Sequence, residues 1–148
     1  MRLFLLCLSI FFALSGARAD DVAEAKVAFA TLVDYQKKDD IRTLDLFTQD
    51  CAVKFTVTDG KATRAAVIPA DVFREMLAKS IALKHGNKDV YEEVKYSQEG
   101  VCVRVTSTIL YAETGKRGPF SALYVRDKAV LKIKELNVTL PENAVPSE

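Results

Sequence analysis

Carboxylate, hydroxyl and phenol groups at inward positions of predicted strands are the side chains of this sequence that could do chemistry. Successive residues of a strand point to opposite faces, so Glu92 shares a face with the apolar Val94, and Ser107 shares one with Val105. A polar group on an apolar inner face needs a partner or a purpose. The candidate pocket residues are Tyr35, Asp59, Glu92, Ser107 and Tyr111.

A carboxylate beside a tyrosine in an apolar pocket suits proton transfer. Burial raises the pKa of a carboxyl group, so Glu92 would take or hold a proton near neutral pH. A tyrosine can donate a hydrogen bond to an oxygen on which negative charge develops. The alternative is that Glu92 lies near a strand end and reaches water, and the sequence leaves both interpretations open.

His85 is the only histidine of the chain, which excludes two-histidine metal sites and makes any Ser-His-Asp arrangement depend on this residue. It lies in the last turn of a predicted helix that Gly86 ends. A cation there interacts favourably with the helix dipole, so we interpret His85 as a capping residue rather than a catalytic one. Glycine-rich phosphate loops and histidine-glutamate zinc helices are absent from the sequence. We expect no cofactor and no metal.

The first nineteen residues are typical of a cleavable secretory signal. A positive head at Arg2 precedes an apolar run over 3–14, and the small residues Ala17 and Ala19 suit the peptidase. The run is too short to span a bilayer. We expect residues 1–19 to be removed after Ala19, and the mature protein to be periplasmic or secreted, without a membrane anchor.

Net charge argues against nucleic acid as a partner. The 21 basic residues fall to 19 once Arg2 and Arg18 are removed with the signal, against 20 acidic residues, so the mature net charge is about −1. Capture of nucleic acid or of anionic lipid needs clustered positive charge. We expect neither partner.

Cys51 and Cys102 are the cysteines that the mature chain keeps. Strand alternation places Cys51 on an inner face with Val53, whereas Cys102 falls with Arg104 on an outer face. Bridged cysteines need Cβ atoms within about 4.5 Å of each other, pointing together. We therefore expect no disulfide within the chain.

Hydrophobic periodicity predicts one α+β domain over residues 20–140. The capping-box spacing of Asp21 and Glu24 indicates a helix start. Apolar residues at helical spacing in 70–85 predict a buried stripe of Val72, Phe73, Met76, Leu77 and Ile81. Residues 141–148 have no periodicity and are expected to form a tail. The pattern predicts helices over 21–38, 41–47 and 70–85, and strands over 51–58, 63–68, 90–96, 101–111, 120–125 and 129–138.

This order of elements, with Asp39-Asp40 and the segment Leu44-Asp45-Leu46-Phe47-Thr48-Gln49-Asp50-Cys51-Ala52-Val53, resembles the nuclear transport factor 2-like superfamily, also called cystatin-like or SnoaL/ketosteroid-isomerase-like. The resemblance covers nearly all of the mature chain. It implies a curved antiparallel sheet wrapped as a cone around three N-terminal and central helices, with an internal pocket. Many relatives dimerise through the outer face of the sheet.

Ketosteroid isomerases in this superfamily use an aspartate on the first strand as base and a tyrosine on the first helix. Alignment on Phe47 places Phe55 at the base position, or Thr56 after a slip of one residue, and Thr31 at the tyrosine position. Neither Phe55 nor Thr56 can act as the base, and Thr31 cannot replace the tyrosine. The resemblance therefore does not carry the isomerase activity to this chain.

Two functions remain open. The first is a non-catalytic module that binds a small apolar ligand or serves as a dimeric accessory domain. The second is a small pocket enzyme, such as an isomerase, cyclase or hydrolase, that uses carboxylate and tyrosine groups. The outer face of the sheet is either a solvated surface or the interface of a two-fold homodimer. Its residues are Arg104, Thr106, Thr108, Lys132 and Lys134.

We predict that the exported protein begins at Asp20, because Ala17 and Ala19 provide the small side chains that signal peptidase accepts. Intact-mass measurement of the protein from its host tests this. A product that retains Met1, or one that carries the mass of a lipid, would contradict the predicted localisation.

Overall fold

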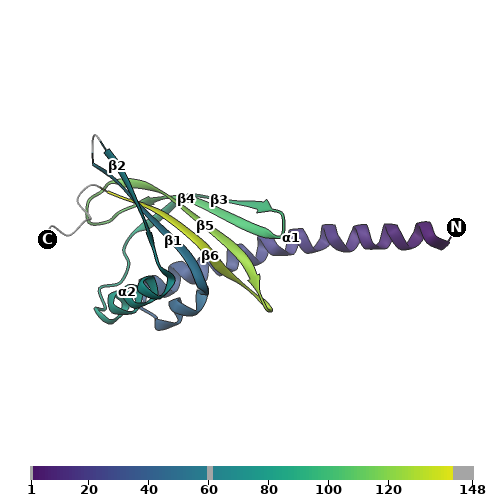
Figure 1. The fold of residues 1–148 in the computed structure, drawn as a ribbon, viewed down its shortest axis with the longest axis horizontal. Helices are drawn as coiled ribbons and strands as arrows, with labels where there is room; N and C mark the ends of the chain where they lie inside the picture. Colours follow the sequence, from purple (N-terminus) through teal and green to yellow (C-terminus); the bar gives the residue numbers. More distant parts are fainter. Residues whose placement is uncertain (1, 60–61, 142–148) are drawn as a thin grey trace.

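A six-stranded sheet with the order β2-β1-β6-β5-β4-β3 curls around the C-terminal part of helix α1 (Figure 1). The computed structural model describes residues 2–59 and 62–141, and the side chains of 20–58 and 62–141. The elements are α1 (Arg2–Lys37), the 3-10 helix η1 (Ile41–Leu46), β1 (Phe47–Asp59), β2 (Ala62–Ile68), α2 (Ala70–Ala82), β3 (Val90–Glu99), β4 (Cys102–Leu110), β5 (Arg117–Asp127) and β6 (Val130–Leu140).

The sheet is mixed, whereas the sequence predicted an antiparallel one. Strands β1 and β6 pair in parallel, and all the other neighbours are antiparallel. Parallel neighbours need a long crossover connection, and the whole segment from β2 to β5 supplies it here. The predicted hairpin of β1 and β2 is confirmed, with Val53 opposite Ile68.

Helix α1 lies in the hollow of the sheet and presents Ala25, Phe29 and Leu32, which are all buried. The Phe29 ring centroid lies 5.2 Å from that of Tyr91 on β3 and 5.9 Å from that of Phe120 on β5. Aromatic pairs at such separations contribute about 1 kcal/mol each beyond the area they bury. These rings fill the part of the cone that lies against the C-terminal part of α1.

The predicted helix start at Asp21 is wrong, because α1 runs through this position from Arg2. Asp21 and Glu24 lie three residues apart on one helix face and both bind Arg126 near the turn between β5 and β6, at 2.6 Å each. Carboxylates that were expected to cap the helix thus fasten it to the sheet. The removal of residues 1–19 stays a prediction.

Within the part of the chain that the structure describes, no helix combines the length and the apolar content needed to cross a membrane.

Helix α2 buries a narrower stripe than the sequence predicted. Phe73 is buried against Phe47, and Leu77 packs on the same core, but Val72 and Met76 are 42% and 50% exposed. Neighbouring residues of a helix lie about 100° apart, so a face centred on Leu77 leaves Val72 and Met76 outside. The helix ends at Ala82, three residues earlier than expected.

Strand β3 contains a bulge that inverts its first half. The register slips between Glu92 and Lys95, and Glu93 has a left-handed φ of 52°. Tyr91 therefore points into the core, whereas Val90 is 51% exposed and Glu92 faces outward. The expectation that Val90 and Glu92 line the inner face is wrong, because one inserted residue exchanges the two faces.

The predicted alternation of inward and outward side chains is confirmed on β4, where Val103, Val105 and Ile109 are buried. It is also confirmed for the cysteines, which are unpaired. Cys51 is buried on the inner face, and Cys102 is half-buried on the outer one.

The backbone of Glu93 yields a stability prediction. A left-handed conformation costs an L residue more than a glycine, so Glu93→Gly should raise the free energy of unfolding by roughly 0.5 kcal/mol, and Glu93→Val should lower it by about 1 kcal/mol. Urea unfolding measures both. The control is Lys95→Gly, where ordinary strand backbone makes glycine unfavourable. Equal decreases in the free energy of unfolding for Glu93→Gly and Lys95→Gly would contradict a left-handed backbone at Glu93.

Candidate functional site

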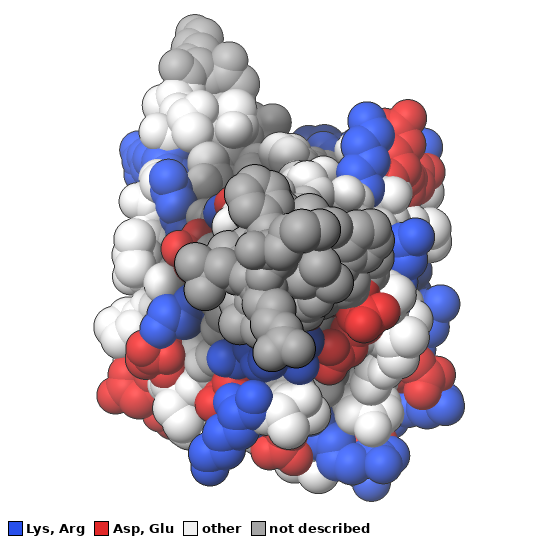
Figure 2. All heavy atoms as spheres, turned by 90° about the vertical axis from the view of Figure 1, so that its right-hand side faces the viewer, with Lys and Arg blue, Asp and Glu red and all other residues white. Residues whose placement is uncertain are grey.

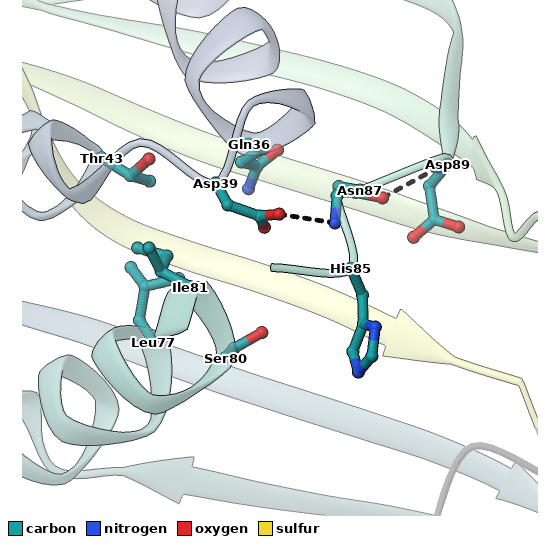
Figure 3. A pocket seen from close by; sticks show the side chains of 10 residues that line it. Gln36, Asp39, Thr43, Leu77, Ser80, Ile81, His85, Asn87 and Asp89 are labelled. Atoms are coloured by element: carbon teal, nitrogen blue, oxygen red, sulfur yellow. Dashed lines mark hydrogen bonds between the residues drawn. The ribbon is translucent and has the colours of Figure 1, made fainter. Parts of the chain in front are cut away.

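A cavity of about 320 Å³ opens between the C-terminal ends of α1 and α2, beside η1 (Figure 3). Leu77 and Ile81 of α2 supply its apolar floor, and polar groups form its rim. The lining residues are Gln36, Asp39, Thr43, Leu77, Ser80, Ile81, His85, Gly86, Asn87 and Asp89.

Asp39 closes one side of the cavity. Its own backbone is left-handed, and its carboxylate accepts a hydrogen bond from the Gly86 amide at 2.7 Å. A side chain at Gly86 would lie 3.0 Å from the Lys37 carbonyl oxygen and would strain a backbone with φ of 64°. This aspartate and this glycine therefore hold the connection between α2 and β3 against the end of α1.

Asp89 lies where three cavities meet. It borders the 320 Å³ cavity, a second of about 380 Å³ beside Phe29, and a third of about 740 Å³ beside Tyr111. Its carboxylate accepts a hydrogen bond from the Ala112 amide at 2.9 Å, and its own amide donates to the Asn87 side chain at 2.8 Å. The group thus joins the loop before β3 to the turn after β4.

Two tyrosines near Asp89 are held as neutral hydrogen-bond donors. The Tyr91 hydroxyl donates to the Gln36 side chain at 3.1 Å, and the Tyr111 hydroxyl donates to the Thr139 carbonyl at 2.6 Å. Burial raises the pKa of Tyr91, and burial raises the pKa of Tyr111 to about 12. The negative charge of Asp89 adds to both shifts. Both side chains keep their protons at neutral pH.

His85 is exposed in the connection after α2, so it does not cap that helix as the sequence predicted. Its imidazole points away from Asp39 and Asp89 (Figure 3). His85 therefore lines the cavity together with Asp39 and Asp89 but points toward neither carboxylate.

None of the predicted pocket residues whose side chains the structure describes lines the 320 Å³ cavity. Ser107 points inward as expected, but its hydroxyl donates a hydrogen bond to the Glu92 carbonyl at 2.8 Å. It thus gives a partner to a backbone carbonyl at the β3 bulge. Tyr35 stacks against the Arg42 guanidinium, 4.6 Å from the ring centroid. Tyr111 borders the 740 Å³ cavity. The side chain of Asp59 lies outside the described residues.

Glu92 lies on the outer side of the sheet and forms a two-point ion pair with Arg117, at 2.7 and 3.2 Å. The hydrogen bond from this guanidinium lowers the pKa of Glu92. The sequence left two positions open for Glu92, an inner face that would raise its pKa and a strand end that reaches water. The β3 bulge turns this side chain away from the inner face.

Gln36, Asp39 and Asp89 are the site residues that the sequence analysis missed. Asp39 belongs to the acidic pair that contributes to the family resemblance, and Asp89 follows Gly86-Asn87-Lys88, a run typical of loops. Loop positions are where binding residues concentrate, so this segment was the available signal.

Among the side chains that the structure describes, those of 20–58 and 62–141, no group of three or more histidine, cysteine, aspartate or glutamate residues is placed to hold a metal ion. Figure 2, which looks from the side of the α1 N-terminus, shows acidic and basic side chains interspersed over this face.

Comparison with known proteins identifies the fold. No family model and no curated protein matches the sequence. A protein from Novosphingobium aromaticivorans described as a candidate scytalone dehydratase is 12% identical, with 84% of this chain and 86% of that chain covered at a TM-score of 0.62. A protein of unknown function from Pectobacterium atrosepticum is 14% identical, with coverage of 82% and 91% at a TM-score of 0.62.

A nuclear transport factor 2-like protein of unknown function from Pseudomonas putida is 8% identical, with coverage of 83% and 88% at a TM-score of 0.60. Likeness at such identities concerns the fold alone. The α+β cone that the sequence predicted is confirmed.

The ion pair of Glu92 yields a pH prediction. Because Arg117 lowers the pKa of Glu92 in the folded chain, the pair stabilises the fold above the carboxyl pKa of the unfolded chain, and this contribution is lost as the pH falls through the folded value. Wild type should therefore exceed Glu92→Gln in thermal stability at pH 7, and the difference should shrink below the ordinary pKa of 4.5. Glu113→Gln, on an exposed turn, is the control. If the difference in thermal stability between wild type and Glu92→Gln grew on acidification, the ion pair with Arg117 would be contradicted as its cause.

Proposed function

We propose that this protein, which has the nuclear transport factor 2-like fold, is an exported non-catalytic module that binds a small ligand in the cavity at the end of α1. The observation that carries the proposal is a cavity with an apolar floor whose carboxylates are already bonded to the backbone. Its volume of about 320 Å³ falls within the range of ligand pockets.

The lining supports a ligand with an apolar body and a few hydrogen-bonding groups. Leu77 and Ile81 offer apolar surface, while Ser80 and Thr43 supply hydroxyl groups at the rim. Asp39 and Asp89 are the carboxylates of the lining, and the lining includes no lysine or arginine. This favours a neutral or cationic ligand over an anionic one.

Two features support binding rather than catalysis. Phe55, at the position of the isomerase base, packs against the core, where it can neither take nor give a proton. The carboxylates of Asp39 and Asp89 accept backbone hydrogen bonds at 2.7 and 2.9 Å, so each is used to hold a loop. A base that also fixes the backbone would loosen the site when it took up a proton.

Export remains part of the proposal through the signal-like residues 1–19. For the outer face of the sheet, we favour a solvated surface over a dimer interface, because its charged side chains are paired within the chain. Arg104 binds Glu99 at 2.7 Å, and Lys132 lies 3.5 Å from Asp127. Ion pairs that are already satisfied gain little from a second copy.

A cavity-filling variant tests the proposal. Ser80 lies on the lining, so Ser80→Trp should displace the ligand, whereas Val130→Trp, which is exposed at the start of β6, should not. Native mass spectrometry of the protein purified from its host should show a bound small molecule on wild type and on Val130→Trp, and at least tenfold less on Ser80→Trp. Equal occupancy in all three would place the ligand elsewhere.

Asp89 and Tyr111 border one cavity of about 740 Å³, which favours a pocket enzyme as the second candidate. Asp89→Asn keeps an acceptor for the Ala112 amide but removes the charge. If the protein only binds, wild type and Asp89→Asn should carry the same molecule. If Asp89 transfers a proton, the variant should instead accumulate a different molecule, the unconverted substrate.

A further inference from the structure

The lining of the 320 Å³ cavity is acidic, although the segments that build it are rich in lysine. Apart from the exposed His85, the titratable side chains of the lining are the half-buried Asp39 and Asp89. Four lysines lie close to these positions in the chain, and none of them lines this cavity: Lys37, Lys38, Lys84 and Lys88. The fold therefore brings the carboxylates to the cavity and leaves their lysine neighbours outside it.

Each of the four lysines is exposed and directed elsewhere. Lys38 pairs with Asp34 at 2.8 Å. Lys37 borders the 380 Å³ cavity, and Lys88 borders the 740 Å³ cavity. Among the ion pairs of the described side chains, none includes either carboxylate of the lining. The negative charge of the cavity is thus not balanced within this part of the chain.

Each lining carboxylate keeps one oxygen for a ligand. The Gly86 amide donates to Oδ2 of Asp39 at 2.7 Å, and the Ala112 amide donates to Oδ1 of Asp89 at 2.9 Å. Among the described groups, none donates to the second oxygen of either side chain. Unbalanced charge in a concave site raises the local concentration of ions of the opposite sign. These oxygens therefore suit a cation that donates hydrogen bonds.

The rest of the lining shows which kind of cation fits. Quaternary ammonium groups are recognised by the faces of aromatic rings, and the described lining includes no phenylalanine, tyrosine or tryptophan. A protonated primary amine instead carries three N–H donors, which carboxylate and hydroxyl oxygens can accept. Ser80 supplies such a hydroxyl, and the floor of Leu77 and Ile81 offers surface to a carbon chain (Figure 3).

We propose that the ligand of this cavity is a protonated primary amine with an apolar chain. Asp39 and Asp89 hold its ammonium group, and Leu77 and Ile81 contact its chain. This inference rests on the proposed function, because it takes the same cavity as the binding site. Complementary charge then provides the specificity, since an anion of the same shape is repelled and a neutral molecule gains only the apolar contact.

Three probes that share a hexyl chain test the proposal. Hexylamine, which is protonated at neutral pH, hexan-1-ol and hexanoate are titrated into the purified, dialysed protein in a calorimeter. Hexylamine should bind with a dissociation constant at least about tenfold lower than that of hexan-1-ol, and hexanoate should bind more weakly than either. Ser80→Trp should abolish the binding of hexylamine, which places the amine in this cavity.

Asp39→Asn is the variant that removes the charge with the least change of shape. Asparagine keeps an acceptor for the Gly86 amide and tolerates the left-handed backbone, whose φ is 50°. The variant should weaken hexylamine binding at least about tenfold and leave hexan-1-ol binding unchanged. Asp45→Asn is the matched control, because Asp45 is exposed on η1 and does not line the cavity. It should bind hexylamine like wild type, and thermal melts of all variants show whether each is folded.

Three results would overturn the proposal. The first is hexylamine that does not bind to wild type. The second is hexan-1-ol or hexanoate that binds as tightly as hexylamine. The third is a folded Asp39→Asn that binds hexylamine as tightly as Asp45→Asn does.

Native mass spectrometry distinguishes these failures from failure of the proposed function. A small molecule that is carried by wild type and displaced in Ser80→Trp would leave the binding cavity in place and reject only the amine. Wild type from its host without any bound molecule would contradict the binding function itself.

Discussion

The packing of Phe29 against Tyr91 and Phe120 is the interaction on which the rest of the structure depends. It joins α1 to an edge strand and to an inner strand of the sheet at once, with centroid separations of 5.2 and 5.9 Å. Strand β3 has a strand neighbour on one side only, so its position relative to α1 depends on this packing together with the hydrogen bond from Tyr91 to Gln36. The loop that carries Asp89 leads directly into β3. The aromatic packing therefore also helps to position the loop of Asp89, where the three cavities meet.

The β3 bulge makes this packing possible, and no residue type in β3 marks its position. Alternation correctly predicted that Val103, Val105 and Ser107 point inward, because β4 is regular. On β3 the same rule failed, because a glutamate rather than a glycine adopts the left-handed conformation at the bulge. Glycine or asparagine would have marked the position. Alternation consequently places Glu92 on the inner face with Val94, whereas in the structure Tyr91 occupies the inward position.

The candidate site was harder to predict than the fold, because loops rather than regular elements build it. The order of the predicted helices and strands was enough to indicate the cone, because the hydrophobic periodicity of each element can be recognised in the sequence. Asp39 and Asp89 are held at the cavity by hydrogen bonds to the backbone of segments that lie far away in the chain. The bond from the Gly86 amide to Asp39 is one example. Periodicity carries no information on such contacts. The same polar residue types that suggest catalysis serve here to fix turns, which is why the likeness of fold does not by itself decide the activity.

The parallel pairing of β1 and β6 has a consequence for how the chain folds. Strand β6 lies between β1 and β5 and is the last strand made, so without it the sheet divides into the pair β2-β1 and the trio β5-β4-β3. Joining them requires contacts across more than half of the chain, which makes the contact order high and folding slow. Synthesis of residues up to Leu140 is thus the step that allows the cone to close, and until then the inner edges of both partial sheets stay open to other chains.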